Sequence, residues 1–145
     1  MELNERVISW GMPEFFADKG IEYRINKPGD FYLIDKEGNK RFEMDFTSFE
    51  NPCRAIPQPK DTLVLNWIQV VKPEDRKKGI ASYYLKKLVE YCTELSITTI
   101  ELSVINMDNT NGKSDAIEGN HLGESELIDF YERHIERDGG LILKI

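Results

Sequence analysis

The hydrophobic and polar residues of the chain are most clearly patterned between residues 63 and 95. The segment Leu63–Val71 is almost continuously apolar and rich in β-branched residues. This composition is typical of a strand buried on both faces, although periodicity alone does not distinguish it from a buried helix. After a short basic turn, apolar residues recur at helical spacing and charged residues occupy the opposite face. The apolar set is Ala81, Tyr84, Leu85, Leu88, Cys92 and Leu95, and the charged set is Lys86, Lys87, Glu90 and Glu94. The pattern predicts a strand, a tight turn and a long amphipathic helix.

Three other stretches alternate as strands do. Phe31–Ile34 and Arg41–Phe46 flank a polar loop that contains a glycine, which predicts a β-hairpin. The segment Ser96–Ile105 alternates as well, and it places Glu101 on the face opposite its apolar side chains. Because this strand follows a strand and a helix, we expect the two strands to be parallel and joined by a right-handed crossover.

The rest of the chain is less regular. Leu3–Trp10 fits either a short helix or a first strand. Pro13–Gly20 predicts a helix, with proline in its first turn and glycine after its last. The remaining predicted elements are a proline-containing loop over residues 47–61, a polar irregular stretch over residues 107–124, a helix over residues 125–135 and a short strand over residues 141–145.

The turn before the long helix carries the most informative chemistry. Arg76, Lys77 and Lys78 precede Gly79 at the expected start of the helix. The first turn of a helix has backbone N–H groups without partners and carries the positive end of the helix dipole. A glycine lets the backbone approach a ligand closely and adopt a positive φ. These features favour a phosphate or pyrophosphate site. A solvated basic loop between a strand and a helix is the alternative, because short glycine turns are common.

Composition limits the classes of protein and partner. The 145 residues suit one domain over residues 1–145, and no repeat or linker divides them. The hydrophobic fraction of 40% and the charged fraction of 31% are typical of a soluble globular protein. No apolar run approaches the roughly 20 residues of a membrane span, so we expect no membrane partner. The acidic start of the chain does not resemble a secretory signal, and Cys92 suits a buried reduced thiol, so we expect a cytoplasmic location. The net charge of −7 argues against nucleic acid and favours a cationic substrate such as an amine. The sequence leaves open whether the protein forms a homodimer.

The segment Val71–Ala81, with the sequence VKPEDRKKGIA, resembles the acetyl-CoA signature of the GNAT-type N-acyltransferases. In that family Arg/Gln-x-x-Gly-x-Gly/Ala follows a Val-x-Pro strand end. Together with the later elements, the resemblance covers residues 63–145. It implies an α/β fold, that is, an α+β mixed sheet, in which a central pair of parallel strands splays apart around the acyl thioester. It also implies acetyl-CoA as the co-substrate and no metal.

The resemblance assigns binding roles to the residues around the turn. The backbone of Gln69, Val70 and Val71 is expected to pair with the pantetheine arm of CoA like an added strand. The residues assigned to the pyrophosphate are Arg76, Lys77, Lys78, Gly79, Ile80, Ala81 and Ser82. The family places its N-terminal region near the acceptor pocket, so Trp10, Phe15 and Phe16 suit that pocket as well as an ordinary core.

Two residues are candidates for catalysis. Glu101 lies five residues before Asn106, which resembles the Glu-x-x-x-x-Asn arrangement of ribosomal-protein N-terminal acetyltransferases. This implies that Glu101 is the general base and that Asn106 contributes to the cofactor site. Phe130–Arg133 resembles the last motif of the family, in which the residue at the position of Tyr131 protonates the leaving thiolate. Glu101 also fits a solvent-facing strand residue, and Tyr131 also fits an amphipathic packing residue.

We therefore expect an N-acetyltransferase that moves an acetyl or other short acyl group from acetyl-CoA to a primary amine by direct attack. A non-catalytic module that binds or senses acyl-CoA is the alternative, and it needs neither Glu101 nor Tyr131. A domain that binds the phosphates of another nucleotide is a third reading. The chain departs from the family pattern at residues 107–124, which look like an insertion, and at residues 135–140. The sequence contains no cluster with metal-ligand spacing.

Overall fold

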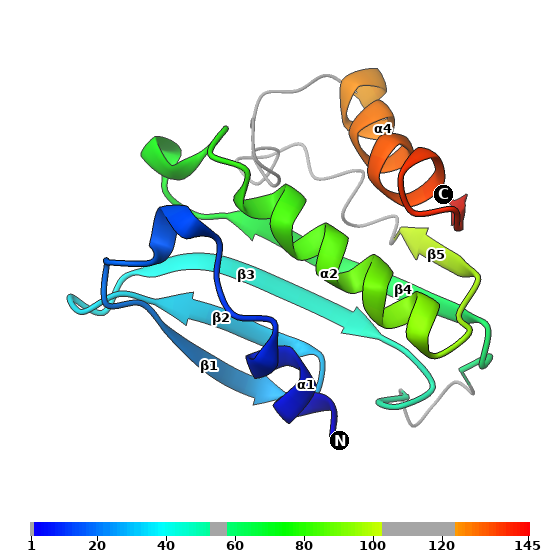
Figure 1. The fold of residues 1–145 in the computed structure, drawn as a ribbon, viewed down its shortest axis with the longest axis horizontal. Coiled ribbons are helices and arrows are strands. Elements are labelled where there is room, and N and C mark those ends of the chain that lie inside the picture. Colours follow the sequence, from blue (N-terminus) through cyan, green and yellow to red (C-terminus); the bar gives the residue numbers. More distant parts are fainter. Residues whose placement is uncertain (1, 53–57, 103–123) are drawn as a thin grey trace.

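Six strands form one mixed sheet in the computed structural model, which describes residues 2–52, 58–102 and 124–145 (Figure 1). The strands lie in chain order across the sheet: β1 (Glu22–Lys27), β2 (Asp30–Ile34), β3 (Lys40–Thr47), β4 (Thr62–Val70), β5 (Thr99–Leu102) and β6 (Ile142–Lys144). Neighbouring strands from β1 to β4 are antiparallel, whereas β4 with β5 and β5 with β6 are parallel. The mixed sheet and the parallel pair that the sequence predicts are confirmed.

The helices lie over one face of this sheet. They are α1 (Leu3–Ser9), α2 (Ile80–Glu94) and α4 (Glu124–Glu132), and a π-helical turn, η3 (Arg133–Arg137), continues α4. Figure 1 shows α2 crossing in front of the central strands, with α1 and α4 on either side of it. Among the residues that the structure describes, no helix has the length and apolar character needed to cross a membrane.

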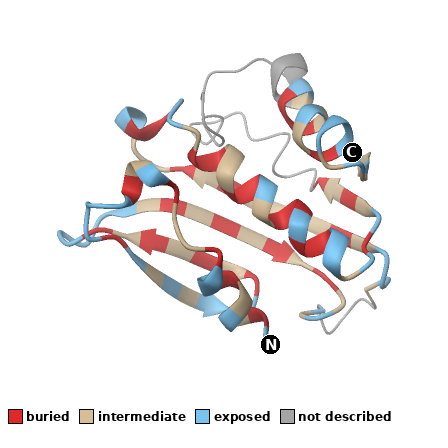
Figure 2. Ribbon diagram, viewed as in Figure 1, coloured by how far each residue is buried: buried red, intermediate tan, exposed pale blue. Residues whose placement is uncertain are grey.

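The hydrophobic core lies between the helices and the sheet. Side chains of the strands that face the helices are buried, and the alternate side chains are half-buried or exposed (Figure 2). In β3, for example, Phe42, Met44 and Phe46 are fully buried. The buried face of α2 includes Ala81, Tyr84, Leu85, Leu88 and Cys92, as its spacing predicts. The amphipathic helix was therefore correctly predicted.

The central strand is confirmed, but its expected burial on both faces is wrong. Leu63, Leu65, Ile68 and Val70 of β4 are buried, whereas Val64, Asn66, Trp67 and Gln69 are half-buried. The reason is that the described helices cover one face only. A continuous apolar run therefore hid the alternation of a strand with one open face.

The N-terminal region differs most from expectation. Of the two alternatives for Leu3–Trp10, the helix is correct: the segment contains α1, and Trp10 is its C-cap residue. The helix expected over Pro13–Gly20 is wrong: the segment contains only a 3₁₀ turn, η1 (Glu14–Phe16). Gly20, with a φ of 66°, then turns the chain toward β1. Strand β1 was missed because most of its residues are exposed and only Tyr23 and Ile25 are partly buried.

Two of the three N-terminal aromatic residues belong to the core. Trp10 is 7% exposed and packs against Phe31, Phe46 and Tyr91. Phe16 is fully buried, and Phe15 is partly buried beside it. The core interpretation therefore holds for Trp10 and Phe16.

Candidate functional site

The turn between β4 and α2 has a backbone that only a few residue types adopt easily. After the 3₁₀ turn η2 (Pro73–Asp75), Lys77 has a φ of 64° and Gly79 has a φ of 82°. Gly79 is the N-cap residue of α2, and no side chain caps this helix end. Among the residues that the structure describes, no atom lies within 4 Å of a Cβ placed on Gly79. Glycine is therefore favoured here by the positive φ and not by crowding from the described residues, which leave space beside it.

The open space faces donors and positive charge. Ile80 and Ala81 begin α2, so their N–H groups have no carbonyl one turn earlier in the helix to bond with. The side chains of Lys77 and Lys78 are exposed on the same turn. The structure thus combines a left-handed glycine, the start of a helix and two lysines in one place, which suits a phosphate group.

The side chain of Arg76 is turned back toward the sheet. It is 8% exposed, and its Nε and Nη2 atoms each donate to a carbonyl oxygen at 3.3 Å, that of Val70 and that of Val71. These carbonyls are at the end of β4. The described contacts of Arg76 therefore stabilise the strand end, while its expected contact with pyrophosphate stays a prediction.

The pairing of β4 with β3 shows which backbone groups face β5. The N–H of Val71 donates to the carbonyl of Arg41 at 3.2 Å, so these two residues form a hydrogen-bonded pair. In an antiparallel ladder such pairs alternate, so Gln69 is bonded to Glu43, and the polar groups of Val70 point to the other side. Of Gln69, Val70 and Val71, only Val70 thus directs its backbone toward β5. Pantetheine pairing at these three residues stays a prediction.

A groove of about 1020 Å³ starts at the same turn and runs along α2 beside η3. Its lining residues are Gly79, Ser82, Tyr83, Lys86, Val89, Glu90, Thr93, Glu94, His134, Asp138 and Gly139. Within it, Oγ of Ser82 lies 3.3 Å from Nε2 of His134. The sequence did not indicate the position of His134 in this groove. His134 follows Phe130 by one helical turn, and this spacing does not show which distant residue the histidine contacts.

Glu101 and Tyr131 lie on different faces of the sheet. Glu101 is in β5 beside Val64 of β4, is half-buried, and points away from the helices, since Ile100 and Leu102 on either side of it are buried in the core. Tyr131 is on α4, is fully buried in the core and packs its ring edge-on against Phe130. The structure therefore does not bring the two expected catalytic side chains together on one face. Asn106, the third residue of this prediction, lies outside the described residues.

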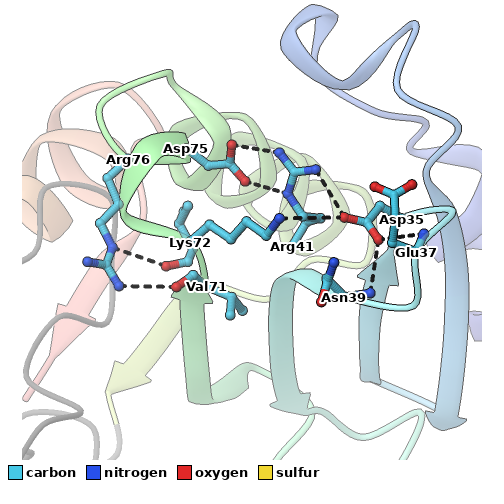
Figure 3. A network of polar contacts seen from close by, with 9 residues as sticks. Asp35, Glu37, Asn39, Arg41, Val71, Lys72, Asp75 and Arg76 are labelled. Carbon is cyan, nitrogen blue, oxygen red and sulfur yellow. Dashed lines mark hydrogen bonds and ion pairs between the residues drawn. The ribbon is translucent and has the colours of Figure 1, made fainter.

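A network of charged side chains lies behind the turn (Figure 3). Arg41 of β3 donates to both carboxylate oxygens of Asp75, at 2.6 and 2.7 Å, and to Asp35 at 3.3 Å. The bond to Asp75 raises the pKa of Arg41 above its ordinary value. The N–H of Asn39 donates to the carboxylate of Asp35, and this bond, together with Arg41, lowers the pKa of Asp35. Arg41 and Asp35 are therefore both held in their charged forms.

The described residues contain no group of three or more His, Cys, Asp or Glu side chains placed to hold a metal ion. A scan against protein-family models found no match, and searches of the curated proteins and of the solved structures found none either.

Proposed function

We propose that the protein is a GNAT-type N-acetyltransferase that moves an acetyl group from acetyl-CoA to a primary amine. One observation carries the proposal. Gly79, with its φ of 82°, caps α2 directly after β4, at the position where the sequence resembles the acetyl-CoA signature of this family. The signature needs a strand, a left-handed glycine and a helix start in this order.

The same geometry accounts for each part of the cofactor. The pyrophosphate binds at the backbone of Gly79, Ile80 and Ala81, with Lys77 and Lys78 adding charge. The nucleotide half extends into the groove that begins at Gly79 and Ser82. The pantetheine arm follows β4, where Val70 directs its backbone toward β5. This route requires β4 and β5 to separate beyond Leu65, the last β4 residue that pairs with β5 in the described part of the chain.

The proposed reaction is a direct transfer. Glu101 takes a proton from the acceptor ammonium, and the free amine attacks the thioester carbonyl carbon. The C–S bond of the tetrahedral intermediate breaks, and Tyr131 gives its proton to the leaving thiolate. The nitrogen loses its second proton to water, which leaves the neutral amide, and a proton from water restores Tyr131. A thioester held between β4 and β5 is exposed to both faces of the sheet. Residues on opposite faces, as Glu101 and Tyr131 are, then suit an amine arriving from one side and a thiolate leaving on the other.

A non-catalytic module that binds acyl-CoA is the second candidate. The observation that favours it is the complete burial of Tyr131, which places the expected acid inside the core. Such a module uses the turn at Gly79 and the groove but has no need of Glu101.

Two measurements on the purified protein separate the candidates. The first is the melting temperature with acetyl-CoA, CoA or ATP at millimolar concentration, and we expect CoA compounds alone to raise it. The second is release of free thiol from acetyl-CoA in the presence of polyamines, amino acids, small amines and peptides with free N-termini. Stabilisation with thiol release supports the enzyme, and stabilisation without release across this panel supports the binding module. No stabilisation by acetyl-CoA rejects both, and stabilisation by ATP alone indicates another nucleotide.

A further inference from the structure

Arg41 joins the phosphate-binding turn to the body of the sheet through Asp75. The side chains of Arg41 and Asp75 are 11% and 1% exposed. The two bonds between them, Nε to Oδ2 and Nη2 to Oδ1, are parallel and short. Such a bidentate pair fixes orientation as well as distance, because both partners are planar.

Arg41 is itself fixed from two further directions, by Asp35 (Figure 3) and by Phe16. Its Nη1 atom donates to Asp35, whose other carboxylate oxygen accepts the N–H groups of Glu37 and Asn39 at 3.0 and 2.9 Å. Its guanidinium also lies over the ring of the buried Phe16, 5.6 Å from the centroid. The β2–β3 hairpin therefore provides a rigid base from which Arg41 reaches the turn.

The turn needs such an anchor. Asp75 precedes Gly79 by four residues, and between them Lys77 has the strained φ of 64°. Within the turn itself, the N–H groups of Asp75 and Arg76 donate to Lys72 and Pro73 at 3.0 and 3.2 Å. The side chain of Arg76 adds bonds to the end of the same strand, β4, and the pair of Asp75 with Arg41 ties the turn to the neighbouring strand β3.

The charges of the network also favour a role for Arg41 in anion binding. Asp35 and Asp75 carry two negative charges, and Arg41 and Lys72, whose Nζ lies 3.8 Å from Asp35, carry two positive ones. Removing Arg41 leaves two buried carboxylates and one lysine next to a site for a polyanion. Loss of Arg41 therefore weakens anion binding in two ways, by freeing the turn and by adding net negative charge.

From this geometry we infer that Arg41 is a positioning residue, which acts through Asp75 to hold the turn in the shape that receives a diphosphate. The inference rests on the proposed function for the identity of the ligand. Stability alone does not explain the pair, because a buried ion pair can often be replaced by apolar residues without loss of stability. This difference between stability and positioning makes the inference testable.

The decisive variant replaces the whole pair, Arg41→Met with Asp75→Leu, so that neither charge of the pair is left alone. Asp35 loses its bond to Arg41 but keeps Lys72 and the N–H groups of Glu37 and Asn39 as partners. The matched control is Arg24→Met with Glu22→Leu, which removes an exposed Arg–carboxylate pair at 2.9 Å on β1. We expect both variants to melt close to the wild type. The first variant should bind acetyl-CoA roughly tenfold more weakly, and the control should bind as the wild type does. Arg41→Lys, which keeps the charge but not the bidentate geometry, should also bind more weakly.

Hydrogen exchange without ligand gives a readout that does not depend on CoA. The amides of Asp75 and Arg76 should exchange faster in the Arg41→Met/Asp75→Leu variant, while amides in the middle of α2 stay protected. If the wild type binds acetyl-CoA and this variant binds equally well, or its turn amides are unchanged, the inference is wrong and the proposed function stands. If the wild type binds no CoA compound, the proposed function fails, and the diphosphate role of Arg41 fails with it. Faster exchange of the turn amides would then still show that Arg41 holds the turn.

Discussion

Glu101 and Tyr131 lie on opposite sides of the sheet, the first on its helix-free face and the second fully buried under the helices. A direct contact between the two side chains is excluded by this arrangement. They can act on one reaction only if the reacting group itself passes between the strands. The proposed mechanism therefore makes separate predictions for the two residues.

Replacing Glu101 by glutamine should lower turnover without weakening acetyl-CoA binding. A general base typically contributes about 10²–10⁴ in rate, so we expect a loss in that range. The loss should shrink at high pH, because the amine acceptor then loses its proton to solvent. Steady-state thiol release between pH 7 and pH 10 measures both effects.

The control for this variant is Glu22→Gln, which changes an exposed carboxylate on the same face at β1. It should leave turnover unchanged at every pH. Wild-type turnover of Glu101→Gln at neutral pH, with the true acceptor, would show that another group removes the proton.

Replacing Tyr131 by phenylalanine should lower turnover by about 10²-fold or more, and raising the pH should not restore it. The missing proton donor is not replaced when solvent becomes more basic. Since the side chain is fully buried, removing its hydroxyl should also change the stability, by about 1 kcal/mol. The melting temperature and the turnover at saturating acetyl-CoA are measured on the same samples.

Tyr84→Phe is the control that separates the loss of a proton donor from the loss of stability in Tyr131→Phe. Tyr84 is also fully buried, and its hydroxyl donates to the carbonyl of Gly11 at 2.9 Å. Its loss should lower the melting temperature to a similar extent and leave turnover per folded molecule unchanged. Equal turnover losses in the Tyr131 and Tyr84 variants would mean that Tyr131 acts through packing alone.

Gly79→Asp should abolish stabilisation by acetyl-CoA, whereas Gly79→Asn should retain part of it. Asparagine and aspartate have nearly the same shape, and both tolerate a positive φ better than other side chains do. A Cβ at Gly79 meets no atom of the described residues within 4 Å, so crowding by these residues does not separate the two variants. The two variants therefore differ mainly by one negative charge beside the expected pyrophosphate. Equal melting shifts with acetyl-CoA in both variants would show that no anion binds at this turn.

The strand, turn and helix around Gly79 were predictable because each has a strong local signal. An apolar run forms β4, and a glycine marks the left-handed N-cap of α2. The helical period of α2 is clear over its fifteen residues. The hairpin of β2 and β3 was predictable for the same reason, since its two runs alternate around a short polar loop. Local patterns of this kind depend on few distant contacts.

The features that sequence did not show depend on contacts between distant segments. Arg41 and Asp75 are 34 residues apart, and neither belongs to a motif that indicates the other. His134 and Ser82 are 52 residues apart and meet only because η3 packs beside α2. Arg76 donates to the carbonyl oxygens of Val70 and Val71 at the strand end, and no local motif indicates these two acceptors. In each case the fold, and not the local pattern, decides the partner.

Asp45→Asn should stabilise the protein at neutral pH and have no effect in acid. Burial raises the pKa of Asp45, and so does Asp30, its direct cross-strand neighbour. A group whose pKa is raised by folding favours the folded state below its unfolded pKa, and this contribution is lost as pH rises through the folded pKa. The charged carboxylate is thus unfavourable at pH 7, and the amide removes the cost. Because the side chain is only half-buried, we expect a rise of roughly 1–2 °C in melting temperature. The gain should disappear below about pH 3.9, where Asp45 is protonated in both states. Glu22→Gln, which lies opposite Ile34 and no carboxylate, should show no such gain. A melting temperature for Asp45→Asn that equals the wild type at pH 7 would show that solvent screens the repulsion completely.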